Sequence, residues 1–262
     1  MKLKTAIFLS LVTLTATGVF AQKTEKPKTA APATDVKNVA KPEKMPNAAE
    51  ILTKYVQAIG GRAANEKIKT RYIKGTFDLA PMGVKGDVES YTAAPGKSYT
   101  KSNLQGIGEI IEGTDGATAW SSNPLQGTRD KTGDELVQSK LINNFNREIN
   151  LDKLYSNWTV KGVEKVGDKD AYVLTATSAG LAAETFYFDK QTGLLLRTDG
   201  TLISPEGNMA AKSFFEDYRE VDGVKMPFKT RVVLPQYEIT NTLLEVKHGV
   251  TIDEAKFAKP KQ

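Results

Sequence analysis

The sequence predicts a mainly β domain of the α+β class, in which about eleven antiparallel strands form a barrel or a strongly curled sheet. Three observations predict this class. Runs of alternating apolar and polar residues follow one another from residue 72 to residue 247. Turn residues rich in Gly, Pro and Asp separate these runs. Helical spacing is confined to two or three short stretches. So many antiparallel strands protect their edges by closing or curling.

The N-terminal residues have the pattern of a secretory signal peptide. Two lysines precede an uncharged, mostly apolar run of 16 residues, and Val19-Phe20-Ala21 predicts cleavage after Ala21. The alternative is an uncleaved membrane anchor, for which such a run is short. We therefore predict a signal peptide at 1–21 and a periplasmic location. The chain has no cysteine, so no lipid-acceptor cysteine follows the signal and the protein is not expected to be a lipoprotein.

Residues 22–47 are rich in Lys, Ala, Pro and Thr, and we predict that they form a disordered leader. Residues 1–47 hold eight of the 36 basic and three of the 31 acidic residues, so the remaining 28 of each sign balance in 48–262. A nucleic-acid-binding domain would carry its own basic face, so we expect no nucleic-acid partner. The leader is interpreted as a solvated linker, with weak attraction to a membrane surface as the alternative.

The single domain predicted at 48–262 begins with a short amphipathic helix. Asn47 and Glu50 have the spacing of a capping box, and Gly60-Gly61 supplies a left-handed end. A phosphate-binding loop would place its glycines before a helix rather than after one. The two glycines are therefore interpreted as structural.

Strands follow, interrupted once by a helical stretch. The helical stretch is expected at about 134–147, with a second short helix at 151–156. The alternation places Ile73, Gly75, Phe77 and Leu79 on one strand face. The predicted strands are 72–79, 84–93, 97–103, 109–112, 117–121, 158–166, 171–177, 183–189, 193–199, 213–220, 224–233 and 238–247.

The sequence offers few residues that could catalyse a reaction. Without cysteine there is no thiol nucleophile or thiolate metal site. His248 is the only histidine, and no G-x-S-x-G elbow accompanies it, so it is interpreted as a surface or structural residue. Glu216 and Asp217 are neighbours in a strand and face opposite ways, which makes them a poor acid–base pair. We expect no enzyme activity, no catalytic residue, no metal and no cofactor.

Several turn motifs, taken together in order, resemble bacterial LolA-like proteins of the outer-membrane lipoprotein-sorting or lipoprotein carrier type. They are Ala58-Ile59-Gly60-Gly61, Ala94-Pro95-Gly96-Lys97, Asp115-Gly116 with Trp120, YFDKQTGLLLR at 187–197, FFEDYREVDGVKMPFKTRV at 214–232, and Phe257 with Pro260. The resemblance spans about 48–260. It implies a half-open antiparallel barrel with two or three helices as a lid or plug around an apolar cavity for acyl chains. The chain is longer than the best-studied carriers and has a leader that they lack. The resemblance therefore implies the fold more directly than it implies the cargo.

The function that the resemblance implies is a periplasmic carrier or chaperone for lipids or lipidated proteins in outer-membrane lipoprotein sorting. Each buried methylene contributes about 0.8 kcal/mol, so one 16-carbon chain is worth on the order of 12 kcal/mol. The alternative is a non-enzymatic regulatory or scaffold protein, such as a lipoprotein-stress sensor or a zinc-protease accessory, with periplasmic protein partners. The candidate cavity residues, which could equally fill a packed core, are Ile73, Phe77, Leu79, Val88, Ile110, Trp120, Phe186, Phe188, Leu195, Phe214, Val232 and Leu243.

Overall fold

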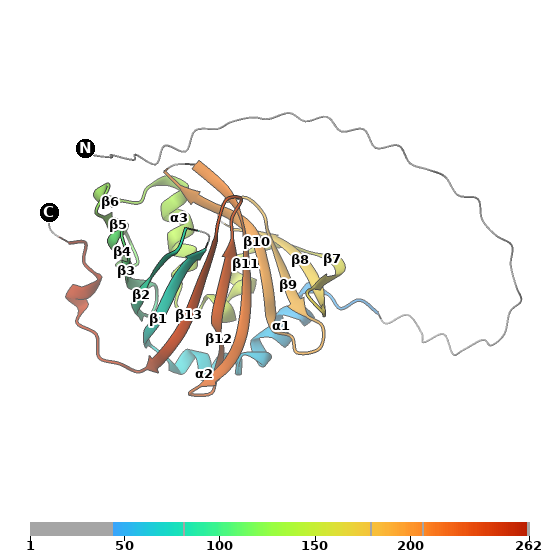
Figure 1. Ribbon diagram of the computed structural model, residues 1–262. Coiled ribbons are helices and arrows are strands. Elements are labelled where there is room, and N and C mark those ends of the chain that lie inside the picture. Colours follow the sequence, from blue (N-terminus) through green and yellow to red (C-terminus); the bar gives the residue numbers. More distant parts are fainter. Residues whose placement is uncertain (1–43, 81, 179, 206, 261–262) are drawn as a thin grey trace, which may run out of the picture. The chain divides into compact units, whose positions relative to one another are not determined.

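The computed structural model describes residues 44–80, 82–178, 180–205 and 207–260 of the 262-residue chain. The predicted signal peptide at 1–21 and residues 22–43 of the predicted leader lie outside the described residues. The chain from Lys44 to Gln262 forms one compact unit, and Figure 1 shows its elements. No helix in the described ranges is long and apolar enough to cross a membrane.

Within the described residues, thirteen strands form one antiparallel sheet in the order β6-β5-β4-β3-β2-β1-β13-β12-β11-β10-β9-β8-β7. β6 and β7 are its two edges, so the sheet is not closed. The strands are β1 (Thr70–Ala80), β2 (Val84–Ala93), β3 (Lys97–Leu104), β4 (Gly108–Thr114), β5 (Ala119–Asn123), β6 (Gly127–Asp130), β7 (Ser156–Val166), β8 (Lys169–Thr177), β9 (Glu184–Asp189), β10 (Leu195–Ser204), β11 (Gly207–Val221), β12 (Val224–Val233) and β13 (Glu238–His248).

The helices are few and short. Asn47 caps the first one as predicted: its side chain accepts from the Glu50 backbone N–H at 3.0 Å, and the Glu50 carboxylate accepts from the Asn47 backbone N–H at 2.7 Å. The helices are α1 (Ala48–Ala58), α2 (Gly61–Lys67), α3 (Gly133–Ile142) and α4 (Leu151–Leu154), with 3-10 turns η1 (Arg147–Ile149) and η2 (Glu254–Phe257).

Several details differ from the sequence expectation, among them that β10 runs to Ser204 and β11 starts at Gly207, where strands were expected only at 193–199 and 213–220. The strand count is thirteen because β6, a four-residue polar strand, carries no apolar alternation. Gly60 and Gly61 have φ of 104° and 79° and end α1 as expected, but α2 starts directly at Gly61. The helix expected at 134–147 ends at Ile142, and Arg147–Ile149 forms a separate 3-10 turn.

Gly60 has a specific packing reason. A Cβ at this position would lie 2.1 Å from the carbonyl oxygen of Gly223, in the turn between β11 and β12. The adjacent Ile59 carbonyl accepts the Lys225 backbone N–H at 3.1 Å. The end of α1 is thereby fixed against the sheet, and only glycine fits the approach.

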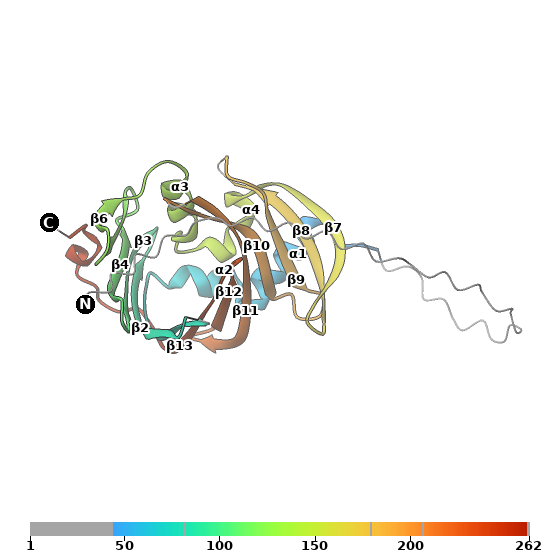
Figure 2. The same cartoon turned by 45° about the horizontal axis from the view of Figure 1, so that its top comes forward.

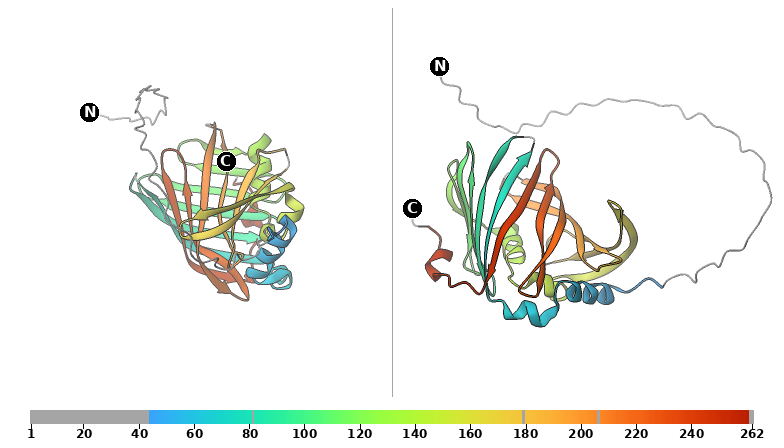
Figure 3. Two further views of the ribbon diagram at one scale, coloured as in Figure 1. Left: turned by 90° about the vertical axis from the view of Figure 1, so that its right-hand side faces the viewer. Right: turned by 60° about the horizontal axis from the view of Figure 1, so that its bottom comes forward.

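The sheet curls so that one face surrounds the helices (Figure 2). We call this the inner face and define it as the face that packs against α1 and α4. In Figure 3 (right), α1 and α2 lie across one end of the curled sheet, in blue and cyan. α3 contacts both β5 and β10. The helices therefore occupy the inner side of the half-open sheet.

The main core lies between α1, η1, α4 and the strands β8 to β10. Its aromatic centre joins helix and sheet, since the Tyr55 and Phe188 rings lie 5.2 Å apart and Tyr155 meets the Phe186 edge at 5.1 Å. The buried members of this cluster are Ile51, Leu52, Tyr55, Ile59, Leu141, Ile149, Leu151, Tyr155, Leu174, Ala176, Phe186, Phe188 and Leu195.

Candidate functional site

The strand register assigns each predicted cavity residue to a face of the sheet. Residues directly opposite each other in paired strands share a face, and so do alternate residues along a strand. One row crosses β1 to β9 through Leu79, Ile239, Val232, Ser213, Thr198 and Phe186. By this rule ten of the twelve lie on the inner face: Ile73, Phe77, Leu79, Val88, Ile110, Phe186, Phe188, Leu195, Val232 and Leu243.

Trp120 lies on the outer face, so it does not join the other ten. Its ring continues a row of aromatic side chains across β1, β2 and β3, with centroids 5.0 to 6.5 Å apart from Tyr72 to Tyr91, Tyr99 and Trp120. It stands opposite Gly113, where a Cβ would lie 2.4 Å from the ring. Trp120 is 1% exposed and fills this outer cluster.

Phe214 also lies on the outer face. It pairs with Arg197 in β10 and Arg231 in β12, and both guanidinium groups cover its ring, at 5.6 and 4.2 Å from the centroid. This is a cation–π arrangement. The twelve residues therefore do not form one lining.

The inner face divides into two parts. On the β7–β10 side, Phe186, Phe188 and Leu195 are 0%, 0% and 4% exposed, and α1, η1 and α4 cover them. These three predicted residues are part of a filled core.

On the β1–β4 and β12–β13 side, nine apolar side chains are half-buried and belong to no core cluster of the described residues, whereas Leu104 and Val224 of the same strands are buried. Hydroxyl side chains lie among them, with Ser90 and Thr100 hydrogen-bonded to each other at 2.9 Å. We call this surface the apolar strip; it consists of Ile73, Phe77, Leu79, Val84, Val88, Ile110, Val232, Ile239 and Leu243.

At the foot of the strip lies a cavity of about 240 Å³, which we call the inner cavity. Leu243 belongs to both the strip and the cavity lining. Tyr55, Ile59 and Ile149 of the helical layer line the cavity, and Arg71 of β1 is one of its charged lining residues. The remaining lining is Asn65, Phe145, Asn146, Glu148, Tyr218, Val224, Lys225, Met226, Pro227 and Thr230.

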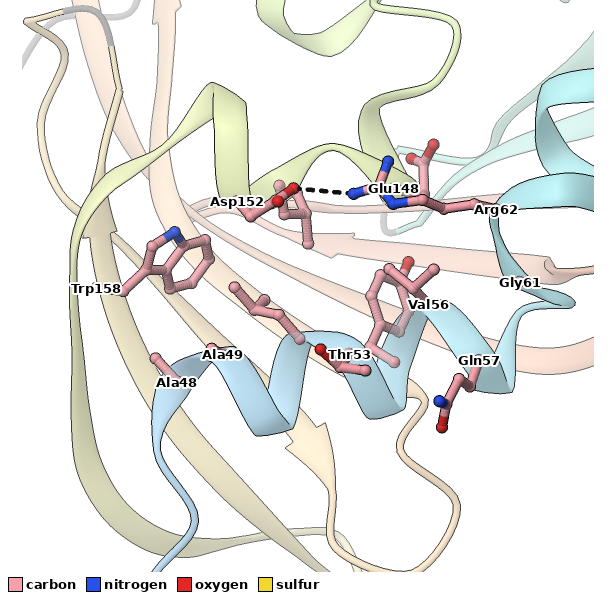
Figure 4. Close-up of a pocket in the computed structure, with 13 residues that line it drawn as sticks. Ala48, Ala49, Thr53, Val56, Gln57, Gly61, Arg62, Glu148, Asp152 and Trp158 are labelled. Carbon is pink, nitrogen blue, oxygen red and sulfur yellow. Dashed lines mark hydrogen bonds and ion pairs between the residues drawn. The ribbon is translucent and has the colours of Figure 1, made fainter.

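A larger cavity of about 550 Å³ lies beside α1, and we call it the α1 cavity. Its apolar lining includes Leu52, Val56, Leu151 and Trp158, and its rim carries the ion pair between Arg62 and Asp152 at 3.3 Å (Figure 4). Tyr55 and Glu148 line both cavities, so the two are neighbours. A volume of this size lies within the usual range for small-molecule sites.

Among the residues that line the two cavities, the sequence reasoning named only Leu243 as a cavity candidate. Those of the α1 cavity come from α1, α2, η1, α4 and β7, and no local pattern brings these segments together. Arg71 is different, because it alternates with Ile73 and Phe77 along β1. That alternation would have placed its side chain on the inner face.

The titratable groups near the inner cavity form a chain of contacts. Arg71 Nε donates to His248 Nε2 at 3.1 Å, and His248 Nδ1 lies 3.0 Å from Asp222 Oδ2. Because Nε2 accepts a hydrogen bond, the ring is neutral and donates from Nδ1. Burial and the Arg71 charge lower the pKa of His248, although Asp222 opposes them. Among the described residues, no group of three or more His, Asp or Glu side chains is arranged to hold a metal ion.

Comparison of the sequence with protein-family models and with curated proteins finds no match. Comparison of the structure with solved structures does find matches. A LolA superfamily protein from Nitrosomonas europaea matches with a TM-score of 0.53 and 14% identity, over 82% of this chain and 99% of the other. The chain adopts the LolA-like fold.

Two further structures agree with this LolA-like fold. A DUF1329 family protein from Desulfovibrio piger matches with a TM-score of 0.55 and 16% identity, over 82% of this chain and 98% of the other. A candidate outer-membrane lipoprotein-sorting protein domain from Vibrio parahaemolyticus matches with a TM-score of 0.53 and 12% identity, over 80% and 97%. The half-open antiparallel barrel predicted from the turn motifs is confirmed.

Proposed function

We propose that this protein is a carrier that binds acyl chains of lipids or lipidated proteins along the apolar strip. The observation that carries the proposal is the strip itself. Its nine side chains share the inner face of a curled sheet, all nine are half-buried, and none belongs to a core cluster of the described residues. A contiguous apolar surface of this kind is costly to leave in water unless it receives a ligand.

The physical gain from binding is large enough to support a carrier. An acyl chain laid on the strip leaves water together with the strip, at about 25 cal/mol for each Å² of apolar surface removed. The interleaved hydroxyl groups are hydrogen-bonded within the sheet at Ser90 and Thr100. The strip therefore offers apolar contact without an unpaired polar group at that point.

We further propose that the protein acts without catalysis in the periplasm. Its only histidine is neutral and held between Arg71 and Asp222, which supports a structural role for this residue. The predicted signal peptide supports export. The match to a structure described as a candidate lipoprotein-sorting domain supports lipidated proteins as the cargo class.

Two adjacent isoleucines of β4 provide a matched test. Ile110 and Ile111 are both half-buried, but Ile110 faces the strip and Ile111 faces Lys101 and Ser122 on the outer side. We expect Ile110→Asn to weaken binding of a fluorescent fatty acid about tenfold, because about two methylene contacts are lost and an amide enters the strip. Ile111→Asn is expected to leave the affinity unchanged.

Val56→Asn adds a second control, because Val56 lines the α1 cavity and is remote from β4 in the chain. Its affinity is expected to match that of the wild type. If Val56→Asn abolished binding and Ile110→Asn did not, the acyl chain would occupy the α1 cavity and the assignment to the strip would be wrong.

A second candidate function is a scaffold or regulatory protein. It is favoured by the filled half of the inner face, where Phe186 and Phe188 are fully buried under α1. If the wild-type protein bound no fatty-acid probe, this second candidate would replace the carrier.

A further inference from the structure

Arg71 places a cation at the end of the apolar strip. It lies two residues before Ile73 in β1, so both side chains share the inner face. Arg71 lines the inner cavity together with Leu243, which is itself part of the strip. A charged group and an apolar surface therefore adjoin along one strand.

The Arg71 guanidinium is held in place, but only some of its N–H donors form hydrogen bonds. Its Nε donates to His248 Nε2 at 3.1 Å, and its carbon lies 5.3 Å from the centroid of the Phe145 ring. The two Nη groups have no hydrogen-bond partner among the described residues, and Arg71 forms no ion pair there. Planar guanidinium groups bind carboxylate and phosphate oxygens through paired Nη donors.

The charges around the cavity favour an anion. Arg71 and Lys225 are its basic lining residues and Glu148 is its acidic one. Burial lowers the pKa of Arg71, while Glu148 raises it. The group remains protonated at any physiological pH.

Thr92 lies beside this site in the sheet. It is paired directly with Arg71 in the register of β1 and β2, and its buried Oγ1 has no hydrogen-bond partner among the described residues. Buried hydroxyl groups are normally paired. Two polar groups at this end of the strip, Arg71 Nη and Thr92 Oγ1, therefore have no hydrogen-bond partner among the described residues.

We propose that Arg71 binds the acidic headgroup, a carboxylate or a phosphate, of an amphiphile whose acyl chain lies on the apolar strip. This inference rests on the proposed carrier function and deepens it by naming the headgroup chemistry. Along β1 the distance from Arg71 to Leu79 is roughly 26 Å at 3.3 Å per residue. An extended acyl chain fits within that length.

Three probes with the same alkyl chain test the proposal by titration calorimetry: dodecanoate, dodecyl phosphate and dodecan-1-ol. The wild-type protein is expected to bind at least one of the two anions about tenfold more tightly than the alcohol. The anion with the higher affinity identifies the headgroup source. Equal affinity for all three would overturn the proposal and leave the carrier function standing, whereas no binding of any probe would overturn both.

Arg71→Gln is expected to lower the affinity for the anions to the affinity for dodecan-1-ol. The affinity for dodecan-1-ol itself is expected to stay unchanged. Arg71→Lys keeps the charge and is expected to retain part of the preference for anions. Lys74→Gln is the matched control, because Lys74 lies on the same strand but is exposed on the outer face, and its binding is expected to equal that of the wild type. An equal loss for anion and alcohol in Arg71→Gln would show a merely structural role and would refute the assignment.

Glu148→Gln gives an independent readout on a second residue. Removing this carboxylate from the cavity lining is expected to raise the affinity for dodecanoate and not for dodecan-1-ol, because only the anion is repelled. A decrease for dodecanoate would contradict an anion site at Arg71.

Discussion

At the scale of single residues, His248 connects the inner cavity with the surface of the molecule. Its side chain is 5% exposed, whereas that of Asp222 is 66% exposed. Arg71, which lines the inner cavity, contacts Nε2 of the ring, and the exposed Asp222 contacts Nδ1. A proton added to His248 would remove the acceptor that Arg71 uses and place two cations in contact.

This arrangement predicts a pH dependence of stability. The pKa of His248 lies below its ordinary value of 6.5 in the folded protein, so the unfolded chain binds more protons in the mildly acidic range. The stabilising contribution is present above the unfolded pKa and is lost as the pH falls toward the folded pKa. Urea unfolding at about pH 7.5 and about pH 5.5 should show that the free energy of unfolding falls more at the lower pH in the wild type than in His248→Gln.

The comparison with His248→Gln isolates one group, because the carboxylates that titrate at lower pH are common to both proteins. His248 is also the only histidine of the chain. Equal losses in the two proteins would mean that the folded pKa of His248 is not lowered.

Residue-scale patterns predicted part of the site. Alternation predicts that Ile73, Phe77 and Leu79 share one face of their strand, and the register places that face of β1 on the inner side of the sheet. Trp120 and Phe214 were grouped with them because alternation fixes the faces within one strand, whereas the relation between strands depends on register and bulges. The register shift between Leu195 and Arg197 is one such irregularity, and no sequence pattern predicts it.

At the scale of elements, α1 packs into the main core of the inner face and also borders both cavities. Its buried residues Ile51, Leu52 and Tyr55 join Phe186 and Phe188 in one cluster. The capping box and the amphipathic spacing predicted the helix itself. Which strands the helix contacts could not be predicted, because that depends on segments more than 100 residues away in the chain.

The packing of α1 makes a prediction about stability. Ile51 is 3% exposed, so Ile51→Ala is expected to lower the free energy of unfolding by about 3 kcal/mol through lost contacts and a cavity. Thr53 is exposed on the other side of the helix, and Thr53→Ala should change the free energy of unfolding by less than about 0.5 kcal/mol. Urea unfolding measures both.

A loss of less than about 1 kcal/mol for Ile51→Ala would indicate a loosely held lid. The filled half of the inner face would then open to ligands, and Phe186, Phe188 and Leu195 would regain the role predicted for them.

At the scale of the whole described unit, the chain combines a filled half with an unfilled half. β7–β10 with α1 and α4 form a core, and β1–β4 with β12 and β13 carry the apolar strip. The open edges at β6 and β7 leave the sheet half-open. In the proposed account, the main core and the ligand-binding surface therefore lie on different strands of one sheet.

The central claim is that this surface carries an acyl chain, and the bound molecule tests it most directly. The mature protein would be purified without detergent from its native cells, extracted with organic solvent and analysed by mass spectrometry, with Ile110→Asn as the control. The account predicts a lipid or acylated peptide in stoichiometric amount with the wild type and a depleted extract with the variant. A clean wild-type extract, together with no binding of a fluorescent fatty acid, would contradict it.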